Sequence, residues 1–317
     1  MKFVTGGAGF IGSAVVRNLL ARGDEVRVVD DLSKGSTSNI PEGVDYLEGD
    51  LSDPEVCSTA FKGVDTCFHL AAKIGGIGYF HRYPADILDD NNLMLSRVFR
   101  TATNVGAKVV YVSSSMVFER ATEFPTPEDA IDRSPPPFSA YGFSKMIGEW
   151  YCRAFDEQFG TAFGIARPFN AYGPGELPEG EPGLAHVIPD LIRKVLDGER
   201  PIPLLGDGQQ TRSFTYVDDV ADAIVTIGTD ARGENEDFNI GTGVETSIRE
   251  LLSMIWGACG EEGDPEVTHG PPMPVDVARR VPDVSKIRRV LEWSASMPLE
   301  EGIRRTVEWY RRASPRA

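Results

Sequence analysis

Short apolar runs alternate along the first half of the chain with segments whose apolar residues recur at helical spacing. Residues 2–5 form an extended apolar run, and residues 11–22 carry Val15, Val16 and Leu19 at the spacing of a helix. Further strands are predicted over residues 25–30, 64–71, 108–113 and 161–167. Because these runs are mostly continuously apolar, they predict a parallel sheet that helices cover on both faces.

The pattern changes after Pro168, where proline and glycine become dense and loops with short helices are expected. Residues 216–226 nevertheless predict a helix and residues 237–240 a strand, so the chain is expected to return to the sheet. Helices are predicted again over residues 247–259 and 300–311. The sequence therefore predicts an α/β fold, a doubly wound parallel sheet of the Rossmann type with a smaller, discontinuous C-terminal α/β domain.

Composition narrows the classes of partner. The 317 residues are 41% hydrophobic and 25% charged, which is ordinary globular composition with room for about two domains. A net charge of −16 repels phosphate backbones and acidic lipids, so we expect no nucleic-acid and no membrane partner. An early glycine turn and the lack of a long apolar run predict a cytoplasmic protein. The four cysteines are widely spaced, and no metal site is expected.

The strongest local motif is the glycine-rich loop Gly6-Gly7-Ala8-Gly9-Phe10-Ile11-Gly12, between the first predicted strand and the first helix. Glycines in such a loop permit a tight turn, close approach of a pyrophosphate to backbone N–H groups, and close helix packing. The second predicted strand ends at Asp30, where a carboxylate can accept hydrogen bonds from ribose hydroxyls but repels a 2′-phosphate. The combination predicts NAD rather than NADP as the cofactor.

Candidate chemistry lies on Tyr141 and Lys145, which are four residues apart at the start of a predicted helix and so share one face. An adjacent ammonium favours the phenolate form of a tyrosine by Coulomb attraction. The run Ser113-Ser114-Ser115 ends an apolar strand at the carboxyl edge of the sheet, where ligands of α/β proteins bind. A hydroxyl there can orient a substrate.

These motifs occur together with several others in a fixed order. The sequence resembles the extended short-chain dehydrogenase/reductases, specifically the sugar-nucleotide epimerase/dehydratase family, over nearly its whole length. The matching segments are residues 5–12, Gly49-Asp50-Leu51, His69-Leu70-Ala71-Ala72, the serine run, Tyr141 with Lys145, Arg167-Pro168-Phe169-Asn170-Ala171-Tyr172-Gly173-Pro174, Gly206-Asp207-Gly208 with Arg212, and Asn239-Ile240-Gly241.

The resemblance implies roles for individual residues. It makes Ser114, Tyr141 and Lys145 the catalytic set, places Asp50 and Leu51 against adenine, and places Asn170 and Arg212 against the diphosphate of the substrate. It places residues 187–196 against the nucleotide base. The expected cofactor-binding residues are Gly6, Gly9, Phe10, Ile11, Gly12, Asp30, Asp50, Leu51, Ala71, Ala72, Tyr141, Lys145 and Pro168. The expected substrate-binding residues are Ser114, Asn170, His186, Val187, Arg212 and Arg279.

The resemblance also divides the chain into functional parts. Residues 1–168 and 211–241 are expected to form the NAD-binding Rossmann domain. Residues 169–210 and 242–317 are expected to form the domain for the sugar-nucleotide substrate. Helices over residues 91–103 and 145–158 are those that pair across a dimer in many relatives, so a homodimer is expected.

Departures from the family pattern narrow the reaction. The family's 4,6-dehydratases carry an Asp-Glu pair where this chain has Ser115 and Met116, and neither side chain is a carboxylic acid or base. The same methionine replaces a glutamate typical of sugar-nucleotide decarboxylases. Residues 73–77 and 186–189 resemble GDP-fucose synthase, in which the matching histidine is a proposed acid, but its assisting cysteine falls at Met116. A further departure is Met273, where epimerases of the family often carry a phosphate-binding arginine, for which Arg279 or Arg280 can substitute.

The sequence thus favours an NAD-dependent sugar-nucleotide 4-epimerase that works through a transient 4-keto intermediate. The alternatives left open are a nucleotide-sugar 4-ketoreductase or a dehydratase of the same family, on a scaffold like that of GDP-fucose synthase. A cofactor-binding protein without catalysis is less consistent with the chain, because it has no need of Ser114, Tyr141 and Lys145 together.

Overall fold

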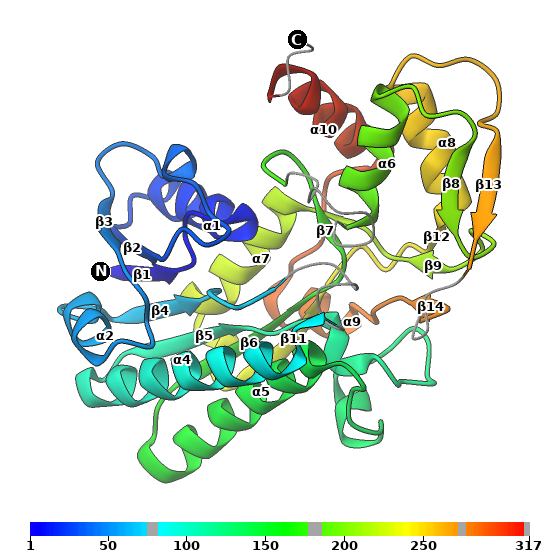
Figure 1. Cartoon of the computed structure of the whole chain (residues 1–317). Coiled ribbons are helices and arrows are strands. Elements are labelled where there is room, and N and C mark those ends of the chain that lie inside the picture. The colour runs from blue at the N-terminus through cyan, green and yellow to red at the C-terminus, as the bar shows by residue number, and fades with distance from the viewer. Residues whose placement is uncertain (75–81, 177–185, 272–276, 314–317) are drawn as a thin grey trace.

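A seven-stranded parallel sheet forms the centre of the computed structural model, which describes residues 1–74, 82–176, 186–271 and 277–313 (Figure 1). Its strand order is β11-β6-β5-β4-β1-β2-β3, and every neighbouring pair is parallel. The strands are β1 (Lys2–Thr5), β2 (Val26–Asp30), β3 (Asp45–Glu48), β4 (Thr66–His69), β5 (Lys108–Val112), β6 (Phe163–Pro168) and β11 (Glu236–Ile240). The predicted doubly wound α/β fold is confirmed.

Helices cover both faces of this sheet, as continuously apolar strands require. On one face, α2 (Pro54–Ala60), α4 (Pro84–Val105) and α5 (Ala140–Phe159) enclose a core that includes Phe3, Phe61 and Phe99. On the other face, α1 (Phe10–Ala21) and α7 (Val217–Thr229) enclose a core that includes Val28 and Phe238. Figure 1 shows α4 and α5 side by side beneath the strands.

Three more helices and seven short strands gather in a smaller lobe beside the carboxyl edge of the sheet (Figure 1). Its helices are α6 (Val187–Leu196), α8 (Ile248–Ala258) and α10 (Leu299–Ala313), which share one apolar core. Short strands pair as β8 (Ile202–Leu205) with β13 (Val267–Gly270), β7 (Ala171–Tyr172) with β10 (Thr215–Tyr216), and β9 (Thr211–Arg212) with β12 (Thr246–Ser247) and β14 (Arg279–Arg280).

Two parts of the chain differ from the predicted division into domains. Residues 211–212 belong to β9, which pairs with strands of the smaller lobe, so the return to the central sheet begins at α7. The helix α9 (Ser285–Leu291) was expected in the substrate part, but Val284, Ile287 and Leu291 are buried in the core of the Rossmann part. These side chains are apolar, and α9 packs against β11 of the central sheet.

One strand of the sheet has no counterpart in the sequence prediction. The residues of β3 are exposed or half-buried, and Asp45 and Glu48 begin and end the strand. The strand lies at the edge of the sheet, where only β2 pairs with it, so it needs no continuous apolar run. Within the described ranges, no helix is long and apolar enough to span a membrane.

Candidate functional site

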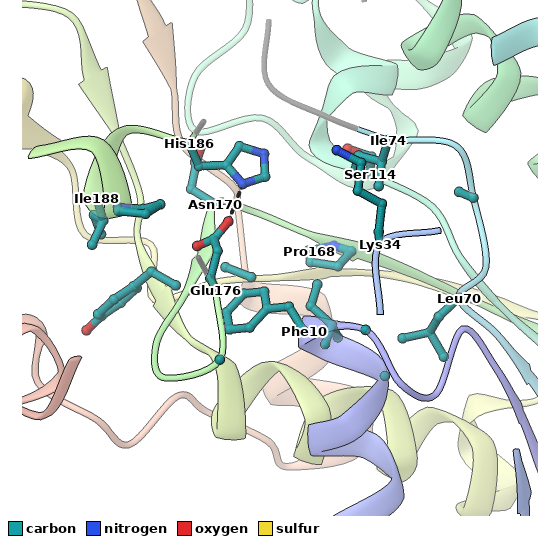
Figure 2. Close-up of a pocket in the computed structure, with 18 of the residues that line it drawn as sticks. Phe10, Lys34, Leu70, Ile74, Ser114, Pro168, Asn170, Glu176, His186 and Ile188 are labelled. Atoms are coloured by element: carbon teal, nitrogen blue, oxygen red, sulfur yellow. Dashed lines mark hydrogen bonds and ion pairs between the residues drawn. The ribbon is translucent and has the colours of Figure 1, made fainter. Parts of the chain in front are cut away.

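A cavity of about 1300 Å³ lies along the carboxyl edge of the sheet and extends under the smaller lobe. Every residue that the sequence predicted for the site lines this cavity, with the exception of Arg279. Figure 2 shows Phe10 and Pro168 on one side of it, and His186, Glu176 and Ile188 on the other. The cavity therefore brings the expected cofactor residues and the expected substrate residues into one space.

The glycine loop packs so tightly that two of its positions exclude any side chain. A Cβ on Gly12 would lie 2.0 Å from the carbonyl oxygen of Gly6, and a Cβ on Gly6 would lie 2.9 Å from the backbone of Ala71. Gly6 also has a φ of +68°, which favours glycine. Gly9 is the N-cap of α1 without a side-chain cap, so the first N–H groups of the helix remain available to an anion in the cavity.

Asp30 ends β2 beside this loop, and its carboxylate is held by backbone groups. Its Oδ2 accepts from the N–H of Ala8 at 2.9 Å, and its Oδ1 accepts from the N–H of Leu32 at 2.9 Å. Burial raises the pKa of Asp30 above its ordinary value, and the two backbone hydrogen bonds partly oppose that increase. A fixed carboxylate at this position is suited to accept from vicinal hydroxyls and unsuited to a phosphate.

The catalytic candidates come from two neighbouring elements. Ser114 follows β5 and caps the 3-10 turn η2 (Ser115–Phe118), where its Oγ accepts from the N–H of Met116 at 3.2 Å. Ser139 caps α5 by accepting from the N–H of Gly142, so Tyr141 and Lys145 lie in the first turns of the helix. Both are almost fully buried at 5% exposure, and Lys145 Nζ donates to the carbonyl of Val112 at 2.9 Å.

Burial dominates the proton affinities of this pair. Burial raises the pKa of Tyr141 above its ordinary value, although a hydrogen bond with Ser114 opposes the increase. Burial lowers the pKa of Lys145 from 10.5 to about 8. The expectation that a neighbouring ammonium favours the phenolate rests on charge alone, and in this structure desolvation of the phenol acts in the opposite direction. A positive charge close to the phenol stabilises its anion.

His69 ends β4 beside Lys145 and is buried at 3% exposure. Its Nδ1 lies 2.8 Å from Thr5 Oγ1, and that oxygen already accepts from the N–H groups of Leu70 and Ala71. The threonine hydroxyl therefore donates to Nδ1, which leaves the imidazole neutral. Burial first, and then repulsion by Lys145, lowers the pKa of His69 from 6.5 to about 3.

We expect this histidine to make the fold acid-sensitive. Between pH 6.5 and 3 the unfolded chain binds a proton at His69 that the folded chain excludes, so stability falls as the pH decreases through this window. The loss should reach about 3 kcal/mol at pH 4. Urea unfolding at several pH values should show that the free energy of unfolding decreases less steeply with falling pH for His69→Gln than for the wild type. His269→Gln, at an exposed site on β13, should leave the slope unchanged, and equal slopes for all three proteins would contradict the assignment.

The expected substrate residues lie on the side of the cavity formed by the smaller lobe. Asn170 has a φ of +40°, and its Nδ2 donates to the carbonyl of Ser213 at 3.1 Å. Arg212 Nη1 donates to the carbonyl of Thr211 at 2.8 Å. His186 is the N-cap of α6, so Val187 opens the first turn of that helix at the cavity.

The structure corrects the expectation for Arg279. Its guanidinium points away from the cavity and donates to both carboxylate oxygens of Glu245 at 2.8 Å. Arg280, the next residue on β14, lines the cavity instead. Successive side chains of a strand point to opposite faces, so only one of the two can do so. Met273 lies outside the described residues, as do residues 75–77 and most of the loop 176–184.

Sequence reasoning assigned no role to two further residues, one in the cavity and one in a small pocket that shares Lys145 with it. Glu176 and His186 Nδ1 share a short hydrogen bond (Figure 2, dashed line). Glu176 follows the glycine-rich residues 173–175, which have no periodic pattern from which its position could be predicted. Asn91 on α4 accepts from the N–H of Lys73 at 2.7 Å and donates to Ser144 Oγ at 3.3 Å, next to Lys145. Its position on a helix face toward the sheet was the available signal.

Comparison with known proteins matches residues 3–241 to the model of the NAD-dependent epimerase/dehydratase family. The chain belongs to this family. NAD is the cofactor that the family's description names, and a solved member, the UDP-glucose 4-epimerase of Thermus thermophilus, is in complex with NAD. That structure has a TM-score of 0.88 and 32% identity, covering 99% of this chain and all of its own.

Two further members of the family are similar over nearly their whole length. A UDP-glucose 4-epimerase of Mycolicibacterium smegmatis is 37% identical over 320 residues, which cover 98% of each chain. A UDP-glucose 4-epimerase of Thermotoga maritima, solved with UDP-glucose, has a TM-score of 0.90 and 33% identity and covers 98% of this chain and 99% of its own. Nucleotide-sugar decarboxylases, reductases and dehydratases of the family are also similar to this chain.

Proposed function

We propose that the protein is an NAD-dependent sugar-nucleotide 4-epimerase that inverts C4 through a transient 4-keto intermediate. The observation that carries the proposal is the position of Ser114, Tyr141 and Lys145 on the wall of the cavity onto which the glycine loop opens. Two 4-epimerases among the similar proteins, at 37% and 33% identity, support it.

The cofactor residues fit NAD on the geometry of this chain. The tight packing of Gly6 and Gly12 lets the loop turn directly into α1, and Gly9 has no side chain at the helix N-terminus, where a pyrophosphate would bind. Asp30 would accept from the adenosine ribose, and Asp50 with Leu51 would border the adenine. When bound, NAD would supply a reversible hydride acceptor and a positive charge in the cavity that Tyr141 lines.

The residues of the chain then divide the proton chemistry among them. Tyr141, as phenolate, would remove the proton of the C4 hydroxyl, and Ser114 would hydrogen-bond to the same oxygen. Lys145 would stabilise the phenolate electrostatically from its buried site, 5.8 Å from the ring centroid. After the 4-keto sugar has turned in the cavity, the hydride would return to the opposite face of C4 and Tyr141 would return the proton to the same C4 oxygen. C4 is then inverted, and no net reductant is consumed.

The substrate would bind through its nucleotide in the smaller lobe. Arg212 and Arg280 line the cavity and would neutralise a diphosphate. Asn170 lines the same cavity, two residues after Pro168. The first turn of α6 would meet the base. Because the similar 4-epimerases are named for UDP-glucose, we infer that UDP-glucose and its C4 epimer are the first substrates to test.

The main alternatives differ in their proton donors. Met116 lines the cavity next to Ser114, where a 4,6-dehydratase would need a carboxylic acid. One observation supports a 4-ketoreductase that resembles GDP-fucose synthase: His186, which matches the proposed acid of that enzyme, lies in the cavity in contact with Glu176. Such an enzyme would consume a reduced nicotinamide, and a dehydratase would release water.

A panel of UDP-, GDP- and dTDP-hexoses separates these functions. For an epimerase, proton NMR should show inversion at C4, and mass spectrometry should show that product and substrate have the same mass. The absorbance of the nicotinamide should show no net change. Stoichiometric oxidation of NADH or NADPH with a nucleotide 4-keto sugar as the substrate would instead identify the reductase, and a product of the hexose panel lighter by one water would identify the dehydratase.

We also infer that the protein is a homodimer that pairs through α4 and α5. On α5, Trp150 is 65% exposed, and on α4, Leu93 is 43% exposed, whereas Phe155 is buried and belongs to the core. Light scattering should give a dimer for the wild type and a monomer for Trp150→Glu. Leu205→Glu, at an apolar residue of the smaller lobe that is 46% exposed, should remain dimeric. A monomeric wild type would refute the inference.

A further inference from the structure

A connected group of buried and partly buried ions lies behind the wall that carries the catalytic residues. Glu149 on α5 and Arg167 on β6 both have 0% side-chain exposure and form a bidentate pair, with Nε–Oε1 at 2.8 Å and Nη2–Oε2 at 2.6 Å. The same Nη2 lies 2.7 Å from Asp237 Oδ2 on β11, and Asp237 Oδ1 accepts from Lys286 Nζ at 2.6 Å. We call Glu149, Arg167, Asp237 and Lys286 the ion cluster.

Stability alone is a weak reason for this ion cluster. Removing two charges from water costs more than most ion pairs return, and apolar residues of similar volume often stabilise a core better. Asp237 nevertheless stays ionised. Burial opposes the ionisation of Asp237, but the attraction of Arg167 and Lys286 outweighs it and lowers the pKa of Asp237 to about 2. Asp237 is therefore ionised at neutral pH. The cluster also has directional bonds that apolar packing cannot supply.

A hydrogen bond links the ion cluster to the strand end that carries Ser114. Ser113 Oγ donates to Glu149 Oε1 at 2.6 Å, and Ser113 directly precedes Ser114 at the end of β5. Glu149 also lies one helical turn after Lys145 and two turns after Tyr141, on the same side of α5. One carboxylate thus fixes the strand end that carries Ser114 relative to the helix that carries Tyr141 and Lys145.

Arg167 adds a second contact to the same wall. Its guanidinium lies 5.2 Å from the ring centroid of Phe118, which ends the 3-10 turn that Ser114 begins. Arg167 is also followed directly by Pro168, a residue of the cavity. The turn that holds Ser114 is therefore fixed on one side through Ser113 and on the other through Phe118.

We propose that Glu149 is a positioning residue, which sets the distance of Ser114 from Tyr141 and Lys145 through Ser113 and Arg167. The inference rests on the proposed function, because it assigns these three residues the proton chemistry. It predicts that loosening the contact to Ser113 changes turnover, whereas binding of the sugar nucleotide, which involves the other lobe, is retained. Displacement of reacting groups by a fraction of an ångström already lowers rates strongly.

Ser113→Ala is the decisive variant, because it removes one hydrogen bond and leaves the ion pair in place. We expect kcat to fall about tenfold to 100-fold with KM for the sugar nucleotide within about twofold of the wild type. Thr103→Val is the matched control. It removes a hydroxyl that bonds to Thr161 at 2.8 Å, near the end of α4 remote from the catalytic wall, and should leave kcat unchanged. Glu149→Gln should lower kcat further if it folds.

A second readout does not depend on turnover. In protein labelled with fluorotyrosine, Tyr141→Phe identifies the fluorine NMR resonance of Tyr141. Ser113→Ala should shift or broaden that resonance, and Thr103→Val should not. If no sugar nucleotide is turned over, the proposed function fails while the resonance still decides the positioning role. An unchanged resonance in Ser113→Ala, or a kcat equal to that of Thr103→Val, would overturn the proposal.

Discussion

Tyr141→Phe should lower kcat about 1000-fold while NAD and the sugar nucleotide still bind. The substitution removes only the hydroxyl, and proton transfer by a positioned side chain contributes roughly 100-fold to 10,000-fold to a rate. The ring itself packs against Ile87 and Met116 and would remain there, so the fold should be preserved. Steady-state kinetics on the substrate found in the hexose panel measure the effect, and calorimetry measures NAD binding.

Tyr151→Phe is the control for this substitution. Tyr151 lies on the same helix, and its ring stacks on Phe155 with centroids 5.6 Å apart, away from the cavity. Removal of the Tyr151 hydroxyl should leave kcat within about twofold of the wild-type value, because no proton transfer passes through this hydroxyl. If Tyr141→Phe kept more than about a tenth of the wild-type kcat, another group would have to act as the base, and the proposed role would be wrong.

The fold could be predicted from the sequence where local pattern and tertiary environment agree. Strands buried on both faces, such as β5, have continuous apolar runs, and the glycine loop lies where a strand meets a helix. The pattern gave no indication of β3, because an edge strand with exposed residues needs no apolar run. It also misplaced residues 284–291, since a short amphipathic helix does not reveal which of two cores it joins.

The candidate site was predictable as a set of residues, but its electrostatics were not. The spacing of Tyr141 and Lys145 suggested an ammonium that lowers the pKa of the phenol, whereas the structure buries both groups and desolvation dominates. Likewise, adjacent arginines at 279 and 280 cannot be told apart in sequence. The register of β14 decides which one reaches the cavity. Burial and register depend on contacts between distant segments, which a local pattern does not contain.

Gly12→Ala should both destabilise the fold and weaken NAD binding, because the new methyl group has no space. Its Cβ would lie 2.0 Å from the carbonyl oxygen of Gly6 and 2.9 Å from Gly7, and both contacts are backbone atoms that cannot rotate away. Moving α1 from the loop should cost about 3 kcal/mol of unfolding free energy. The same displacement withdraws the helix N-terminus from the pyrophosphate, so NAD affinity should fall about tenfold or more.

Gly257→Ala is the matched control, at an exposed position of α8 where an added Cβ meets nothing within 4 Å. It should stabilise the fold by about 0.5 kcal/mol and leave NAD affinity unchanged, because alanine favours a helix interior over glycine. Urea unfolding and calorimetric titration with NAD compare the two variants. Unchanged NAD affinity in Gly12→Ala would show that the dinucleotide does not bind against this loop.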